Sequence, residues 1–306
     1  MNTERPFRFL ADVSGQPDGP ALAVLARRAQ SLGYSALMMP DHLVGQYAPI
    51  PLLTAVVMAT ETLRVGTFVL NNNLRHPAVL AQDLATLDRL SGGRLDIGIG
   101  FEPVGTRIGK LAEAVAVLKA CFGDERFSFS GEHYSITGYD AQPKPVQRPH
   151  PPIFIGGGGK RLLTLAGQQA QRVGLAPRLV QDAQGSPALD VPSITLAATE
   201  EKIGWVRAAA GERFEEIELN TYPSGGPMVL TGNAKAEAAR RASELRARTG
   251  IELTVQDILD SPHVFIGTIN ELTRKLLDLR ERLGISSFLV DDMEAFAPIV
   301  AELAGS

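Results

Sequence analysis

The sequence contains a single cysteine, Cys121, among its 306 residues. One thiol can form neither an internal disulfide nor a cysteine-cluster metal site, and we expect Cys121 in the apolar core. No apolar run reaches the roughly 20 residues that a membrane-spanning helix needs, and residues 1–8 lack the apolar centre of a signal peptide. We therefore expect a cytoplasmic protein without a membrane partner.

The sequence also lacks a surplus of positive charge. Its 30 lysines and arginines stand against 34 aspartates and glutamates, and the net charge is −4. Without a basic surface for a phosphate backbone, we expect no nucleic-acid partner. No two histidines stand at the helical spacing of metal ligands, so we expect no metal site either.

Apolar residues, by contrast, are plentiful, at 44% of the chain. This content can fill one large core, and we expect a single domain over residues 1–306. Short apolar runs alternate with amphipathic segments along the chain. In residues 64–100, an uncharged run at 65–70 is followed by three asparagines, a helical pattern that begins at Pro77, a glycine pair and another apolar run.

Eight buried strands are expected from this alternation, at residues 7–11, 36–39, 65–70, 95–99, 153–155, 173–176, 217–222 and 287–290. A helix is expected after each strand. The helix after the sixth strand is expected at residues 200–210. Residues 181–192 are expected to form a loop. Repeated alternation of this kind predicts an α/β fold, a closed (β/α)8 TIM barrel, with an open doubly wound sheet as the alternative.

Residues 127–152 interrupt the alternation before the fifth strand. Aromatic and polar residues alternate around Ser130 and Gly131, and prolines follow. Prolines exclude a central strand or helix, so this segment predicts a hairpin-like excursion outside the barrel that borders the site.

The site of such a barrel is built from loops at the carboxyl ends of the strands. His42 comes shortly after the second expected strand and beside Asp41. An imidazole can transfer a proton near neutral pH, and this position favours a catalytic role over a structural turn at the rim.

Four glycines, Gly156, Gly157, Gly158 and Gly159, follow the fifth expected strand and precede Lys160. Glycines let backbone amides approach an anion at the start of a helix, which favours a phosphate site over a simple turn. The run matches neither the dinucleotide fingerprint nor the P-loop. Two further glycines, which include Gly100, end the fourth strand, where they either permit close packing or leave room for a flat ring.

The order of these motifs resembles the luciferase-like monooxygenase superfamily, in particular its branch of F420-dependent oxidoreductases. The resemblance spans nearly the whole chain and is carried by residues 75–100, the Asp41–His42 pair, residues 151–161 and residues 267–284. It implies a TIM barrel that binds a flavin or a deazaflavin at the carboxyl ends of its strands.

The resemblance also implies roles for individual residues. His42 corresponds to a proton-handling histidine with Asp41 beside it, and the glycine run with Lys160 corresponds to the loop that binds the cofactor's phosphate. Phe68 and Val69 occupy the place of a non-proline cis peptide that supports the cofactor ring. Asn71, Asn72, Asn73 and Gly100 are expected near that ring.

Together these features imply an F420-dependent oxidoreductase that transfers a hydride between the deazaflavin and a small organic substrate; whether it forms a homodimer is left open. An FMN-dependent luciferase-like monooxygenase is the first alternative. Glu102 follows Gly100 closely, where relatives have a longer acidic loop, so a non-catalytic cofactor-binding or degenerate barrel is the second alternative. Gln171 replaces a common aspartate, and we expect a structural role for it.

Overall fold

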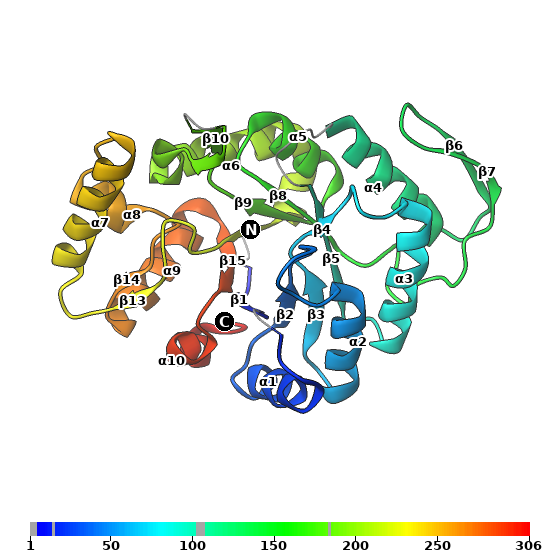
Figure 1. The fold of residues 1–306 in the computed structure, drawn as a ribbon, viewed down its shortest axis with the longest axis horizontal. Helices are drawn as coiled ribbons and strands as arrows, with labels where there is room; N and C mark the ends of the chain where they lie inside the picture. The colour runs from blue at the N-terminus through cyan, green and yellow to red at the C-terminus, as the bar shows by residue number, and fades with distance from the viewer. Residues whose placement is uncertain (1–4, 14–15, 102–107, 183–184) are drawn as a thin grey trace.

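The computed structural model describes residues 5–13, 16–101, 108–182 and 185–306, so Glu102 lies outside the described residues. Eight parallel strands pair in a closed ring, and the last pairs with the first. They are β1 (Arg8–Asp12), β2 (Ala36–Met39), β3 (Arg64–Thr67), β5 (Leu95–Gly100), β8 (Ile153–Gly157), β9 (Arg172–Leu175), β12 (Glu218–Thr221) and β15 (Ile285–Val290). The predicted TIM barrel is confirmed, and the open sheet is wrong (Figure 1).

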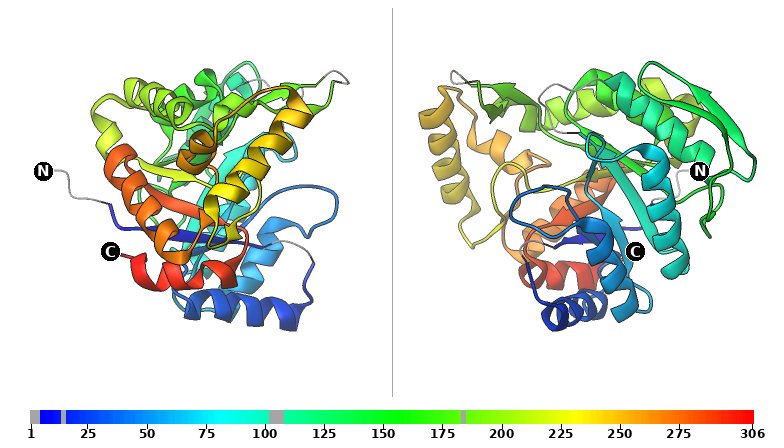
Figure 2. Two further views of the ribbon diagram at one scale, coloured as in Figure 1. Left: turned by 90° about the vertical axis from the view of Figure 1, so that its left-hand side faces the viewer. Right: turned by 45° about the vertical axis from the view of Figure 1, so that its right-hand side comes forward.

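Helices follow the strands around the barrel (Figures 1 and 2). They are α1 (Gly19–Ser31), α2 (Pro49–Ala59), α3 (Pro77–Leu90), α4 (Ile108–Phe122), α5 (Lys160–Gln169), α6 (Leu196–Ala210), α9 (Ile269–Leu283) and α10 (Met293–Leu303). Apolar side chains between strands and helices form the main core, and Cys121 is buried within it, as expected. None of the helices in the described segments is long and apolar enough to cross a bilayer.

The strand expected at residues 65–70 is interrupted. β3 ends at Thr67, the Phe68–Val69 peptide bond is cis, and β4 (Leu70–Asn71) then pairs with the end of β5. The cis bond agrees with the family resemblance. A Cβ on Gly98 would lie 1.9 Å from the Thr67 carbonyl oxygen, and one on Gly100 would lie 2.7 Å from Val69 Cγ2. Gly98 therefore lets the two backbones approach closely, and Gly100 leaves room for the Val69 side chain.

The excursion between α4 and β8 is a hairpin, as predicted. β6 (Phe127–Ser130) pairs with β7 (Ser135–Tyr139), and the hairpin lies outside the barrel beside α4 (Figure 1). The Glu113 carboxylate on α4 accepts backbone N–H bonds from Glu132, His133 and Tyr134 at 2.8, 2.9 and 3.1 Å. These three bonds fix the hairpin turn to the helix.

Two predictions in the following segment are wrong. Residues 181–192, expected to be a loop, include part of a hairpin of β10 (Leu179–Gln181) and β11 (Pro187–Leu189) and most of a 3-10 turn, η1 (Val191–Ile194). Every residue of β10 is exposed, so the sequence carries no buried alternation that would indicate a strand. α6 begins at Leu196 rather than at residue 200, because the Thr195 hydroxyl accepts the Ala198 N–H at 3.3 Å.

A smaller unit is inserted between β12 and α9. It contains β13 (Val229–Leu230), α7 (Ala234–Thr249), α8 (Val255–Asp260) and β14 (Ile266–Gly267), drawn in yellow to orange in Figure 1. These elements share their own apolar cluster, which includes Ala238, Ile258 and Val264. A second 3-10 turn, η2 (Gly211–Glu216), leads from α6 to β12.

Alternation along the strands decides which side chains line the barrel interior. On β1, Phe9 and Ala11 belong to the main core beneath the helices, whereas Leu10 clusters across the barrel with residues of other strands. That inner cluster consists of Leu10, Ala36, Met38, Phe68 and Leu289. Arg8 and Asp12, two positions either side of Leu10, face the same interior.

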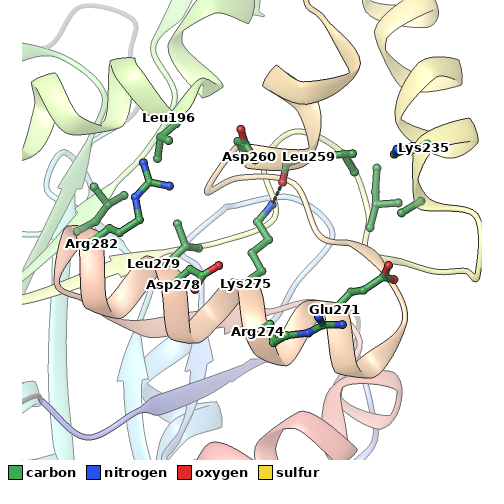
Figure 3. A pocket seen from close by; sticks show the side chains of 13 residues that line it. Leu196, Lys235, Leu259, Asp260, Glu271, Arg274, Lys275, Asp278, Leu279 and Arg282 are labelled. Carbon is green, nitrogen blue, oxygen red and sulfur yellow. Dashed lines mark hydrogen bonds between the residues drawn. The ribbon is translucent and has the colours of Figure 1, made fainter.

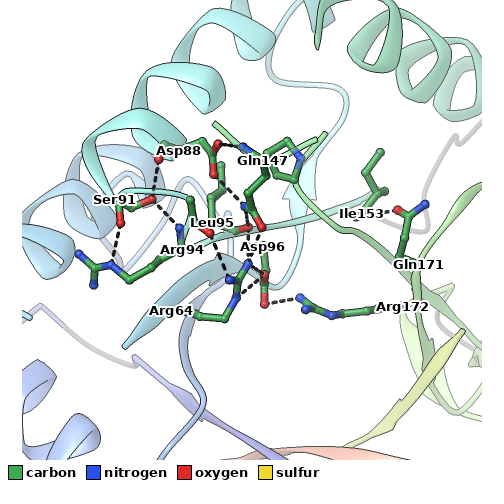
Figure 4. Close-up of polar contacts among 12 residues, drawn as sticks. Arg64, Asp88, Ser91, Arg94, Leu95, Asp96, Gln147, Ile153, Gln171 and Arg172 are labelled. Atoms are coloured by element: carbon green, nitrogen blue, oxygen red, sulfur yellow. Dashed lines mark hydrogen bonds and ion pairs between the residues drawn. The ribbon is translucent and has the colours of Figure 1, made fainter. Parts of the chain in front are cut away.

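An ionic cluster closes the barrel interior at the amino ends of the strands. Asp96 pairs with Arg64 and Arg172 (Figure 4). It also pairs with Arg8 at 2.9 Å, and Arg8 reaches Glu218 at 2.9 Å. Burial alone would raise the pKa of Asp96, but the three arginines hold it well below its usual range. The charged side chains of this cluster are paired with one another, so the cluster is a structural feature rather than a reaction site.

Gln171 has the structural role expected of it. Its side-chain oxygen accepts the Ile153 N–H at 3.1 Å, and its backbone joins β8 to β12 on either side (Figure 4). An amide satisfies this position as well as a carboxylate would.

Candidate functional site

At the carboxyl ends of the strands, solvent reaches the barrel interior. At six strand ends, the last inward-facing residue, which lies in the strand or directly after it, is half-buried, whereas the residue before or after it is fully buried. We call these six the mouth residues: Asp12, Phe68, Gly156, Ala176, Tyr222 and Leu289. Their shared exposure places the candidate site at this end of the barrel, as its fold predicts.

The mouth residues differ in size around the ring. Gly156 on β8 and Ala176 directly after β9 are small, and the Phe154 ring packs 3.1 Å from where a Cβ of Gly156 would lie, whereas Tyr222 follows β12 and Asp12 ends β1. Phe68, Phe154 and Tyr222 form an aromatic cluster, with ring centroids 4.7 Å apart for the two phenylalanines and 5.7 Å for Phe68 and Tyr222. The mouth therefore has a small-residue side and a side that carries polar groups.

Asp41 is buried and fully engaged with two neighbouring segments. Its carboxylate accepts the Asn71 N–H at 3.0 Å and two N–H groups of Arg75 at 2.5 and 3.2 Å. These bonds join the loop after β2 to the segment after β4. The contacts indicate that Asp41 orients the loop on which His42 stands.

His42 is exposed at the barrel rim, and its electrostatic neighbour is Asp12 at the end of β1. Burial and then the charge of Asp291 raise the pKa of Asp12, while His42 acts in the opposite direction. The sequence analysis did not single out Asp12. The alternation Arg8, Leu10, Asp12 at the end of the first strand was the signal that could have found it.

The three asparagines after β4 differ in their contacts. The side-chain oxygen of Asn71 accepts the Asn73 N–H at 3.0 Å, and that of Asn73 accepts a bond from Lys110 at 3.2 Å. Asn72 is 4% exposed, and its side chain faces the Tyr134 hydroxyl, where it partly offsets the rise that burial causes in the pKa of that phenol. This contact joins the asparagine loop to the β6–β7 hairpin.

The β6–β7 hairpin reaches this asparagine loop. Tyr134, in the hairpin turn, packs its ring against the edge of His76 with centroids 5.5 Å apart. His76 in turn caps α3, because its Nδ1 accepts the Ala78 N–H at 3.3 Å. The excursion therefore borders the candidate site, as the sequence analysis expected.

The glycine run leads from the small-residue side of the mouth to α5. Gly158 packs tightly on the loop after β9, since a Cβ there would lie 2.4 Å from the Pro177 carbonyl oxygen. Gly159 is the N-cap of α5, has open space at its Cβ position and provides no side-chain cap. Lys160 follows it and is exposed. The first N–H groups of α5 are thus left for an anion, with a cation beside them.

His263 lies directly behind Tyr222 and is fully buried. Its Nδ1 lies 3.1 Å from the Thr221 hydroxyl and 3.0 Å from the Ser224 hydroxyl, and its ring meets the edge of Tyr222 at 6.5 Å. Burial and then the charge of Lys202 lower the pKa of His263 to about 3. The sequence analysis did not single out this histidine.

This shift predicts acid sensitivity with a definite sign. Because the pKa of His263 is lower in the folded state, its contribution to stability is present above about pH 6.5 and is lost as the pH falls below that value. Between about pH 7.5 and pH 5, urea denaturation should show the unfolding free energy of the wild type falling by about 2 kcal/mol more than that of His263→Asn. Equal losses in both proteins would contradict the buried neutral state.

A separate cleft of about 410 Å³ lies outside the barrel, between α8, α9 and the first residues of α6 and α7 (Figure 3). Within it, Lys275 Nζ donates to the carbonyl oxygens of Leu259 and Val264, both at 2.6 Å. Burial lowers the pKa of Lys275 to about 7. Because the lysine joins α9 to the inserted unit, its contacts indicate a structural role.

No group of three or more histidine, cysteine, aspartate or glutamate side chains within the described ranges is arranged to hold a metal ion. The polar groups at the mouth are instead a histidine, carboxylates, a phenol and backbone amides. Such groups bind and orient an organic molecule and move protons.

Comparisons with known proteins agree with this geometry. Residues 6–287 match the luciferase-like monooxygenase family. Over 209 residues, the chain is 34% identical to an F420-dependent glucose-6-phosphate dehydrogenase of Nakamurella multipartita, which covers 59% of this chain and 60% of that protein. It is 32% identical over 135 residues to an FMNH2-dependent dimethylsulfone monooxygenase of Pseudomonas putida, which covers 40% of this chain and 37% of that protein.

Among solved structures, the fold is similar to the coenzyme F420-dependent tetrahydromethanopterin reductase of Methanopyrus kandleri. The TM-score is 0.72 at 16% identity, over 98% of each chain. At this level of identity the likeness concerns the barrel itself.

Proposed function

Because the chain belongs to the luciferase-like monooxygenase family, we propose that it is an F420-dependent oxidoreductase acting on a small organic substrate. The relatives named as F420-dependent dehydrogenases support this cofactor. The observation that carries the proposal is the surface at this end of the barrel to which the Phe68–Val69 cis peptide, packed on Gly100, and the N-terminus of α5, which has no side-chain cap, both belong. A flat ring with a phosphate-bearing tail fits a surface of this kind.

The residues present fit such a cofactor. Phe68, Val69 and Gly100 would support the ring, and Asn72, buried in the loop after β4, would lie at its edge. The backbone amides after Gly159, with Lys160, would bind the phosphate. Gly156, Gly157 and Gly158 would let this loop pack closely on Phe154, Leu162 and Pro177 and so hold those amides in place. Asn71 and Asn73 are tied to one another and would hold the loop.

Hydride transfer is the chemistry that a bound deazaflavin supplies, and this chain would supply orientation and the matching proton. In the proposal, His42 moves a proton to or from the substrate, and Asp41 keeps the histidine loop in place through Arg75 and Asn71. Asp12, whose pKa is raised by burial and by the charge of Asp291, is the electrostatic neighbour of His42 and would be a second group able to exchange a proton.

Titration of the purified protein with F420 and with FMN tests the cofactor. We expect F420 to bind at least tenfold more tightly, measured by quenching of deazaflavin and flavin fluorescence. Tighter binding of FMN would transfer the assignment to a monooxygenase like the relative named FMNH2-dependent. Binding of neither would favour a barrel without turnover.

A further inference from the structure

Two segments beyond the carboxyl ends of the strands carry large apolar side chains that are exposed to solvent. The first is the loop of residues 41–48 after β2, which we call the rim loop, and the second is the β10–β11 hairpin after β9. The exposed side chains are Leu43 at 79%, Val44 at 87% and Tyr47 at 43% in the rim loop, and Leu179 at 54% and Val180 at 48% in β10. None of them packs into an apolar cluster that the described residues form. Their shared exposure indicates a surface that a further molecule covers.

The two segments lie on opposite sides of the mouth. In the closed ring, β1, β15 and β12 separate β2 from β9 on one side, and β3, β5 and β8 separate them on the other. The rim loop and the hairpin therefore follow opposite strands. Both project past the carboxyl ends of the strands on the same side of the molecule (Figure 2, left). A molecule that extends out of the mouth would lie between them.

Hydrogen bonds of their own hold both segments in place. In the rim loop, the Gln46 side chain donates to the Pro40 carbonyl oxygen at 2.6 Å. The strands of the hairpin pair antiparallel, and its base is fixed because the Arg178 N–H donates to the Ser193 hydroxyl at 2.8 Å. The exposed apolar side chains are thus carried by hydrogen-bonded backbone, which lowers the ordering cost when a ligand buries them.

The apolar character of the two rims continues into the mouth. His42, the residue proposed to move a proton, directly precedes Leu43 in the rim loop, and the hairpin begins three positions after Ala176. The mouth residues that are apolar and half-buried are Phe68, Ala176 and Leu289. Apolar surface therefore extends from the proposed reaction centre outward to both rims, which favours a substrate with a large hydrocarbon part.

We propose that the substrate carries an extended apolar body, and that this body lies between the rim loop and the β10–β11 hairpin while its alcohol or carbonyl group reaches His42. The inference rests on the proposed function and names its substrate class, alcohols and ketones with a long hydrocarbon part. Leu43 and Val44 on one side, with Leu179 and Val180 on the other, are then substrate-binding residues that set the preference for length.

The test measures the binding of 2-butanone, 2-hexanone and 2-octanone by calorimetry, with and without F420. One rim variant combines Leu43→Ser with Val44→Ser, and the other combines Leu179→Ser with Val180→Ser. The matched control combines Val24→Ser with Met58→Ser, at positions that are 64% and 72% exposed on the outer helices α1 and α2. All three variants replace exposed apolar side chains, so the fold should be kept. Fluorescence titration would measure F420 affinity, and sedimentation would measure the oligomeric state.

We expect wild-type affinity to rise roughly threefold for each added methylene group, and so more than tenfold from 2-butanone to 2-octanone. Each rim variant should bind 2-octanone roughly tenfold more weakly, with unchanged affinity for 2-butanone and F420, and the control should match the wild type.

Absence of 2-octanone binding by the wild type, equal affinity for the three ketones, or unchanged 2-octanone binding by either rim variant would overturn the proposal. A dimer that the rim variants dissociate without a change in ketone binding would assign the surface to a second copy of the chain instead. Absence of F420 binding by the wild type would refute the proposed function, whereas the ketone series without F420 tests the apolar surface by itself.

Discussion

Replacing His42 by alanine should lower turnover roughly 100-fold or more, the usual effect of losing a positioned acid or base, while leaving cofactor affinity unchanged. The histidine stands on the loop that Asp41 holds through Arg75, and it is the electrostatic neighbour of Asp12. It lies away from the glycine run that would bind the cofactor. The loss should therefore appear in the chemical step and not in cofactor binding.

Steady-state kinetics with a substrate found among enones and alcohols would measure this loss, and thermal unfolding would be followed on the same preparation. His150→Ala is the matched control, because His150 precedes β8 at the opposite end of the barrel. A role in rim packing predicts the reverse outcome, with lower thermal stability and near-normal turnover in the folded fraction. Activity within a few-fold of the wild type would remove His42 from the mechanism.

Replacing Gly159 by aspartate should weaken F420 binding on the order of 100-fold, because a carboxylate would stand where the phosphate is proposed to bind. The backbone of Gly159 is extended, at φ −105° and ψ 147°, and no atom lies within 4 Å of its Cβ position. Aspartate is also a good N-cap, so the fold should be kept or stabilised. Stability and binding should thus change in opposite directions.

Gly159→Asn separates charge from size. Asparagine caps a helix about as well as aspartate and has nearly the same shape, but it carries no charge. Fluorescence titration of F420 should show a loss for the asparagine variant that is at least tenfold smaller than for the aspartate variant. If both variants bind F420 like the wild type, the glycine run is only a turn between β8 and α5.

The barrel could be predicted from the sequence because each strand is buried on both faces and reads as a short apolar run. Residues 65–70 show the limit of that signal. The run is continuous in composition, yet the backbone turns at Phe68 and Val69, and only Gly98 and Gly100 on the next strand record the close approach. Composition reports burial, whereas the path of the backbone depends on what lies opposite.

The candidate site was predicted less completely than the fold. The sequence placed Asp41 and His42 together but did not show that Asp41 is engaged by Arg75, since that bond joins loops 34 positions apart. Asp12 and Tyr222 were not assigned roles, because their importance arises from facing the same interior as Phe68. Contacts of this kind depend on barrel closure, which no local pattern encodes.

The ionic cluster around Asp96 has a consequence for how such a protein could change over time. It concentrates polar stabilisation at one end of the barrel, whereas the residues proposed for chemistry lie just beyond the opposite strand ends. Substitutions that alter which molecules are accepted can therefore accumulate at the mouth residues without disturbing the interactions that keep the scaffold intact. An engineer seeking a new substrate range would have the same freedom, provided that the arginines around Asp96 are retained.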